Sequence, residues 1–112
     1  MQLIHLYNDL SFEGDSPLVK VILETSFTKE IRILLANGQQ MKEHKSPFPI
    51  MVEVVDGAIN FGVNGQVYEL ARGNLISLKG DISHNLIATE NSIIRLTLSK
   101  FDTVQRVKAI LN

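Results

Sequence analysis

Hydrophobic and polar residues alternate along most of the chain, and this pattern predicts β-strands. Val19, Val21 and Leu23 share one parity while Lys20 and Glu24 share the other, which is typical of a half-buried strand. Further short segments of strand character follow at close intervals. The predicted strands are 18–25, 31–36, 50–55, 58–63, 66–70, 75–78, 84–89 and 92–99.

Turn signals separate these segments. Three dipeptides accept a positive φ at low cost and favour tight hairpins: Asn37-Gly38, Asp56-Gly57 and Asn64-Gly65. Short strands with turns at spacings of roughly 8 to 12 residues indicate an antiparallel sandwich or a small barrel. The pattern therefore predicts an all-β fold.

The two ends of the chain have different patterns. Residues 1–10 mix apolar positions of both parities, and we expect a short strand there, before a turn-rich loop at 11–17. Residues 102–112 change to helical spacing, and Asp102 or Thr103 can cap the helix N-terminus. We expect one short helix, whose apolar side packs on the strands or on a second subunit because so short a helix is marginal alone.

Composition narrows the class of protein. A chain of 112 residues with 45% hydrophobic content is the size of one domain, so we expect a single domain over residues 1–112. Eleven Lys and Arg stand against twelve Asp and Glu, and no stretch of the chain is strongly basic. We therefore do not expect a nucleic-acid partner. The absence of cysteine excludes disulfides and thiolate sites, and no apolar run is long enough for a bilayer. A cytoplasmic protein with no membrane partner is expected.

Candidate chemistry centres on two histidines, His44 and His84, which flank predicted strands. The chain has no phosphate-binding loop, no nucleophile elbow and no metalloprotease helix motif. His5 is interpreted as a surface histidine, with a third-ligand role as the alternative, and Arg95 as part of an outer strand face. A pocket shared by the two histidines is therefore the main hypothesis.

The spacing of glycines and histidines follows two motifs. The first runs Gly, five residues, His, one, His, three or four, Glu, six, Gly. Gly38, His44 and Gly57 match it, with Ser46 and Ile50 at the second His and the Glu. The second runs Gly, five residues, Pro, one, Gly, two, His, three, Asn, and its matches are Gly73 and His84; Lys79, Asp81 and Ala88 stand at the remaining positions.

These motifs resemble those of the cupin family over residues 31–99. The resemblance implies a double-stranded β-helix, a jelly-roll barrel, and it also implies a homodimer. The metal site of that family is usually built from three histidines and a glutamate, of which this chain keeps His44 and His84. Two imidazoles alone hold a metal weakly.

Two functions follow from the resemblance. The first is binding of a small polar molecule, such as a sugar or an organic acid, without a complete metal site. The expected pocket consists of His44, Ser46, Ile50, Phe61 and His84. The alternative is a metal-dependent isomerase, lyase or oxygenase in which His44 and His84 hold zinc, nickel, manganese or iron. A third possibility is a structural or regulatory module whose barrel is filled with side chains.

Overall fold

The computed structural model describes residues 1–111 and contains nine strands and one short helix in that range. The elements are β1 (Leu18–Glu24), β2 (Thr28–Leu35), β3 (Gln40–His44), β4 (Ile50–Asp56), β5 (Ala58–Val63), β6 (Gln66–Ala71), β7 (Leu75–Leu78), β8 (His84–Ala88), β9 (Ser92–Ser99) and α1 (Val104–Ala109). The prediction of an all-β fold with a C-terminal helix is confirmed. The last residue of the predicted helix 102–112 lies outside the described residues.

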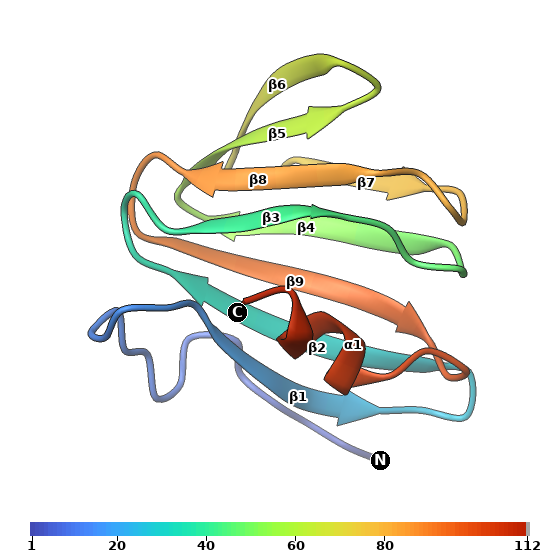
Figure 1. The fold of residues 1–112 in the computed structure, drawn as a ribbon. Helices are drawn as coiled ribbons and strands as arrows, with labels where there is room; N and C mark the ends of the chain where they lie inside the picture. Colours follow the sequence, from blue (N-terminus) through green and yellow to red (C-terminus); the bar gives the residue numbers. More distant parts are fainter. Residues whose placement is uncertain (112) are drawn as a thin grey trace.

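The strands form two antiparallel sheets that face each other (Figure 1). The larger sheet has the order β1-β2-β9-β4-β7, and the smaller has the order β3-β8-β5-β6. Apart from the hairpins β1–β2 and β5–β6, neighbours in a sheet are not consecutive in sequence, as in the pairing of β2 with β9 and of β3 with β8. This crossing connectivity brings residues from the two halves of the chain onto the same strand faces.

Apolar residues of one parity fill the space between the sheets. In β9, Ile94, Leu96 and Leu98 point inward, and all three are buried. The inner face of the smaller sheet contributes Ile59 and Phe61, each 1% exposed. Alternation in the sequence thus places one side of every long strand in the core, as the pleat requires.

Strand β3 is an element that the sequence pattern did not predict. Only Met41 in Gln40–His44 is a buried apolar residue, and Gln40, Lys42 and Glu43 are exposed. A single inward residue gives no alternation that can be recognised, so the strand is formed by its pairing with β8. The ladder shifts register between Met41 and His44.

The structure of the N-terminal segment differs from the predicted one. Residues 1–17 contain no strand, and the short strand expected at 1–10 is replaced by extended chain with a turn at 6–9. The Nη1 group of Arg32, on the outer face of the larger sheet, donates hydrogen bonds to the carbonyl oxygens of Leu6 (3.1 Å) and Asn8 (2.6 Å). These contacts tether the segment to the sheet as coil, with most of its side chains exposed.

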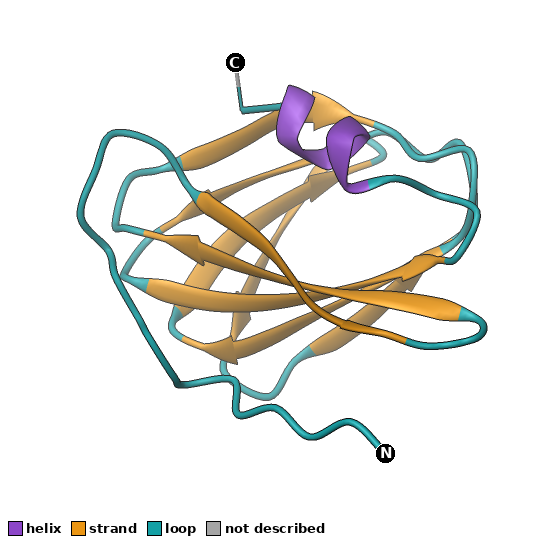
Figure 2. Cartoon of the chain, turned by 90° about the horizontal axis from the view of Figure 1, so that it is seen from below, coloured by secondary structure: helices purple, strands orange, loops and turns teal. Residues whose placement is uncertain are grey.

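Helix α1 lies at one margin of the fold, at the top of the view in Figure 2. Thr103 is its N-cap and accepts a hydrogen bond from the backbone N–H of Arg106 (3.3 Å). Val107 is its buried residue, 1% exposed. Within residues 1–111 the chain has no helix with the length and apolar content that crossing a membrane requires.

Candidate functional site

His44 and His84 lie directly opposite each other on neighbouring strands. His44 ends β3 and His84 begins β8, and they are partners in the antiparallel register of these strands. Their ring centroids are 4.2 Å apart, and the ring planes are inclined by 63°. Two residues forty positions apart in the sequence therefore form one pair at the end of the smaller sheet.

Each ring is fixed by a backbone carbonyl two residues earlier. The Nδ1 of His44 is 2.6 Å from the oxygen of Lys42, and the Nδ1 of His84 is 2.9 Å from the oxygen of Ile82. A carbonyl oxygen can only accept, so each Nδ1 carries the hydrogen. In the neutral ring the lone pair is then on Nε2, and the structure gives neither Nε2 a hydrogen-bond partner among residues 1–111.

Both rings are neutral at pH 7. Burial lowers the pKa of His44 from 6.5 to about 4; the hydrogen bond to the Lys42 oxygen opposes this, while His84 and the charge of Arg106 reinforce it. Burial also lowers the pKa of His84, against its bond to Ile82 and with Arg106 adding to the effect. The site therefore presents two uncharged imidazoles beside a guanidinium.

The wall around the pair is apolar. The ring of Phe61 stacks on that of His84, with centroids 5.6 Å apart and planes inclined by 16°. The histidines share a cavity with residues from both sheets: Ile33, Met41, Ile50, Val52, Phe61, Leu86, Ile94 and Leu96. Its free volume of about 20 Å³ is room for about one water molecule.

Helix α1 closes this cavity. Arg106 and Val107 are among its lining residues. Asp102, which is 3% exposed, accepts two hydrogen bonds from Arg106: Nε to Oδ1 at 2.7 Å and Nη2 to Oδ2 at 2.9 Å. The hydroxyl of Ser46 donates to the same Oδ2 at 2.7 Å. The helix start is thereby attached to the loop that follows β3.

This attachment, the Ser46–Asp102–Arg106 latch, is strongest with Asp102 ionised. Burial acts to raise the pKa of Asp102, but hydrogen bonds from Arg106, Ser46 and the backbone N–H of Thr103 outweigh it, so that the pKa is lowered. Bidentate pairing of a guanidinium with a carboxylate also fixes the geometry. The latch therefore positions Arg106 next to the histidines.

The structure brings four of the five predicted pocket residues together. His44, Ile50, Phe61 and His84 all line the cavity. Ser46 does not: it is 3% exposed, and besides donating to Asp102 its hydroxyl accepts from the N–H of Phe48 at 3.1 Å. After His44 the strand ends, so the alternation that would have aimed Ser46 at the site no longer applies.

Arg106 and Val107 were missed by the sequence analysis. The available signal was the acid and base pair four residues apart, Asp102 and Arg106, at the start of the predicted helix. That spacing predicts the ion pair but not the surface against which the helix packs. His5 is exposed and lines a different cavity, on the side of β1, so it does not join the pair.

The donor set does not fit a divalent metal held by the chain alone. Among residues 1–111 no cluster of three or more His, Cys, Asp or Glu side chains is arranged to hold a metal ion. The side chains at the motif positions of the second histidine and the glutamate are the latch hydroxyl of Ser46 and the apolar Ile50. Arg106 adds a positive charge, which disfavours a cation.

Comparison with protein-family models and with curated proteins finds no match. Solved structures do match. A conserved protein of unknown function from Streptococcus pyogenes is 24% identical, with a TM-score of 0.76 over 91% of this chain and 90% of its own. An RmlC-like cupin from Desulfovibrio desulfuricans is 18% identical, with a TM-score of 0.80 over 88% and 96%. KdgF from Halomonas sp. is 19% identical, with a TM-score of 0.72 over 88% and 94%.

At these identities the similarity is one of fold, and it agrees with the two facing antiparallel sheets and the short C-terminal helix. A protein with a double-stranded β-helix domain from Klebsiella pneumoniae matches in the same way, with a TM-score of 0.79. The chain therefore has the cupin fold, a double-stranded β-helix with a histidine pair inside it.

Proposed function

We propose that the protein binds a small polar molecule at the pair formed by His44 and His84, without a resident metal. The observation that carries this proposal is the orientation of the two rings. Each Nδ1–H is committed to a backbone carbonyl, so two neutral Nε2 lone pairs remain side by side. Such a pair accepts hydrogen bonds from hydroxyl or amide donors of a ligand, and a sugar or an organic acid with hydroxyl groups supplies them.

Ligand entry requires movement of helix α1. The closed cavity holds about one water molecule, and Val107 and Arg106 occupy the side toward the helix. The helix has six residues, of which Val107 is buried and Val104 is partly buried against the core, and the latch attaches its N-terminal end. A segment with so few buried contacts opens locally at a lower free energy than the sheets do. The proposal therefore includes an open state in which α1 moves off the histidines.

The experiment is a titration of the ring nitrogens by NMR. Protein labelled with ¹⁵N at histidine is titrated with a panel of sugars and hydroxy acids at millimolar concentration. We expect at least one compound to shift Nε2 of both His44 and His84 while leaving the exposed His5 unchanged. A Val107→Ala variant, which removes two methyl groups from the closing face, is expected to bind the same compound more tightly.

The control is Phe61→Leu, which keeps the wall apolar but removes the ring stacked on His84. It is expected to weaken binding and to leave the specificity for hydroxyl donors intact. If neither the wild type nor Val107→Ala responds to any compound of the panel, the pocket hypothesis fails. The interior would then be simply a core filled with side chains.

Elemental analysis of purified protein tests the metal-free part of the proposal. We expect less than about a tenth of an equivalent of zinc, nickel, manganese or iron, unchanged in His44→Ala. A stoichiometric metal that is lost in His44→Ala would overturn the proposal. It would favour instead a metal-dependent enzyme in which the two Nε2 atoms are ligands and further ligands come from water or substrate.

A further inference from the structure

A row of positive charges crosses the outer face of the larger sheet, on the side away from the histidines. Lys20 on β1 is the register partner of Arg32 on β2, and Arg32 is the partner of Arg95 on β9. Like charges directly opposite each other on one face of a sheet are destabilising. The row therefore needs negative charge nearby.

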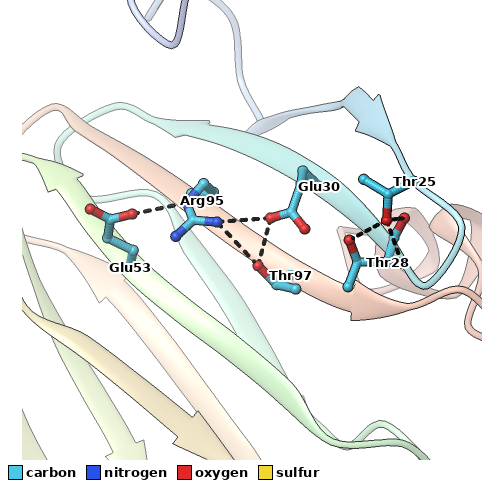
Figure 3. Close-up of polar contacts among 6 residues, drawn as sticks. All are labelled: Thr25, Thr28, Glu30, Glu53, Arg95 and Thr97. Atoms are coloured by element: carbon cyan, nitrogen blue, oxygen red, sulfur yellow. Dashed lines mark hydrogen bonds and ion pairs between the residues drawn. The ribbon is translucent and has the colours of Figure 1, made fainter. Parts of the chain in front are cut away.

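Two carboxylates of this face pair with Arg95. Its Nε is 2.9 Å from an oxygen of Glu53, and its Nη1 is 2.9 Å from an oxygen of Glu30, as Figure 3 shows. Thr97 donates to the same oxygen of Glu30 at 2.6 Å. Within residues 1–111 no carboxylate forms an ion pair with Arg32 or Lys20. Arg95 has two ion-pair partners, and its two neighbours in the row have none among residues 1–111.

Arg32 is also incompletely hydrogen-bonded. Its Nη1 donates to the carbonyl oxygens of Leu6 and Asn8, whereas its Nε is buried and has no partner in the part of the chain that the structure describes. The residue as a whole is 6% exposed. A buried donor left without a partner is costly, and more so on a charged group.

Arg106 shows how the Nε and Nη2 groups of an arginine can bind a carboxylate. The Nε and Nη2 groups of Arg106 hold the two oxygens of the Asp102 carboxylate, at 2.7 and 2.9 Å. In Arg32 the structure records hydrogen bonds from Nη1 only. The edge formed by Nε and Nη2, a geometry that suits a bidentate carboxylate, thus has no partner in the part of the chain that the structure describes, and its Nε is buried.

Two cavities adjoin this side chain, between the N-terminal segment and β1. Their volumes are about 250 and 330 Å³, and Asp9, Lys20 and Arg32 line both. The larger one continues along the apolar side chains of Leu18 and Leu34, which are register partners on the same face as Lys20 and Arg32. A cationic pair at one end of an apolar cavity matches a ligand with one charged group and a small hydrocarbon part.

We propose that this cavity is a second binding site, which takes a small monocarboxylic acid. The carboxylate binds to the guanidinium of Arg32 with Lys20 beside it, and the hydrocarbon part packs on Leu18 and Leu34. Asp9 sets the preference, because its negative charge on the cavity wall opposes a phosphate dianion more than a single carboxylate. The site is independent of the histidine pair, which lies between the sheets.

The experiment is a titration of the full-length protein with butyrate, followed by the ¹H and ¹⁵N resonances of the arginine Nε groups. The Nε–H of Arg32 is expected to shift as butyrate binds to the guanidinium, while that of Arg106, already bound to Asp102, does not. Lys20→Met is expected to weaken butyrate binding about tenfold, as loss of a charge-assisted contact does. Asp9→Asn is expected to strengthen it.

Arg32→Gln is expected to abolish binding, but it also removes the tether of the N-terminal segment, so Lys20→Met is the decisive variant. His44→Ala is the matched control and is expected to leave butyrate binding unchanged, whatever becomes of the interior pocket. The proposal is overturned if millimolar butyrate leaves the Arg32 resonance in place. The assignment to a carboxylate is overturned if inorganic phosphate binds as tightly as butyrate.

Discussion

At the scale of single residues, the histidine pair combines two effects that act in the same direction. Burial removes water from both rings, and the nearby guanidinium of Arg106 disfavours a further positive charge. The backbone bonds of the Nδ1 groups fix the neutral tautomer. Neutral, oriented imidazoles are hydrogen-bond acceptors, which is the property that the proposed pocket uses.

The lowered pKa values predict how stability depends on pH. In the unfolded chain each histidine takes up a proton near pH 6.5, whereas folded His44 does so near pH 4. Between these values the unfolded state binds more protons, so the free energy of unfolding falls as the pH falls from about 6.5 to about 4. Urea denaturation over this range, together with an NMR titration of the rings, measures it.

The matched variant for this prediction is His44→Asn, which keeps a donor for the Lys42 oxygen but does not titrate. Its free energy of unfolding is expected to depend less on pH between 4 and 6.5 than that of the wild type. If the slopes are equal, or if the His44 ring titrates near 6.5, burial does not control the charge of this site.

At the scale of elements, a short helix of low intrinsic stability is held in place by the hydrogen bonds and ion pair of the latch. Helix α1 has six residues and one buried side chain, so it has little stability of its own. The latch attaches it to the loop after β3, and Lys29 of β2 donates from Nζ to the backbone oxygen of Asp102 at 2.7 Å. Three parts of the fold therefore meet at Asp102, namely β2, the loop after β3 and the start of α1.

Asp102→Asn is expected to lower the free energy of unfolding by about 2 kcal/mol or more, because it leaves the Arg106 guanidinium without its carboxylate. It is also expected to increase hydrogen exchange of the α1 amides more than that of the core strands. Chemical denaturation and exchange measured by mass spectrometry give the two quantities.

Arg106→Met serves as the control, because it removes the positive charge of the Asp102–Arg106 ion pair instead of the negative one. The double variant should cost less than the sum of the two single changes, since both remove the same interaction. Additive costs would show that Asp102 and Arg106 are not coupled and that the helix is held by packing alone.

At the scale of the whole molecule, large apolar side chains remain exposed around one end of the fold. Phe27 and Phe101 are each 71% exposed, and Met51 is 40% exposed. At the N-terminus Leu3 is 86% exposed. Apolar surface of this kind often marks an interface. We propose that the partner which covers it is a second copy of the chain, in a homodimer.

The dimer is tested by sedimentation velocity of the wild type and of a Phe27→Ser, Phe101→Ser double variant. The wild type is expected to sediment as a dimer at micromolar concentration, and the variant is expected to shift toward the monomer. Lys45→Ser is a control at an exposed site with no large apolar side chain. A monomeric wild type across the concentration range contradicts the prediction.

Local pattern was sufficient for most of the strands and for the helix, because alternation of parity and helical spacing reflect which side of an element is buried. It was insufficient where a segment is shaped by its partner. Strand β3 exists because β8 pairs with it, and residues 1–10 remain coil because they lie against Arg32 on a sheet that is already formed.

By itself, the sequence determined the fold class and placed His44 and His84 at motif positions that bring them together. Only the tertiary structure decided what surrounds them: α1 closes the cavity, Ser46 turns to Asp102, and Arg106 comes to lie beside the rings. It also left the buried Nε of Arg32 without a hydrogen-bond partner among residues 1–111, on the opposite face of the larger sheet. The physical reason is that period and turn chemistry are local, whereas the partner of a buried polar group is set by contacts between segments far apart in the chain.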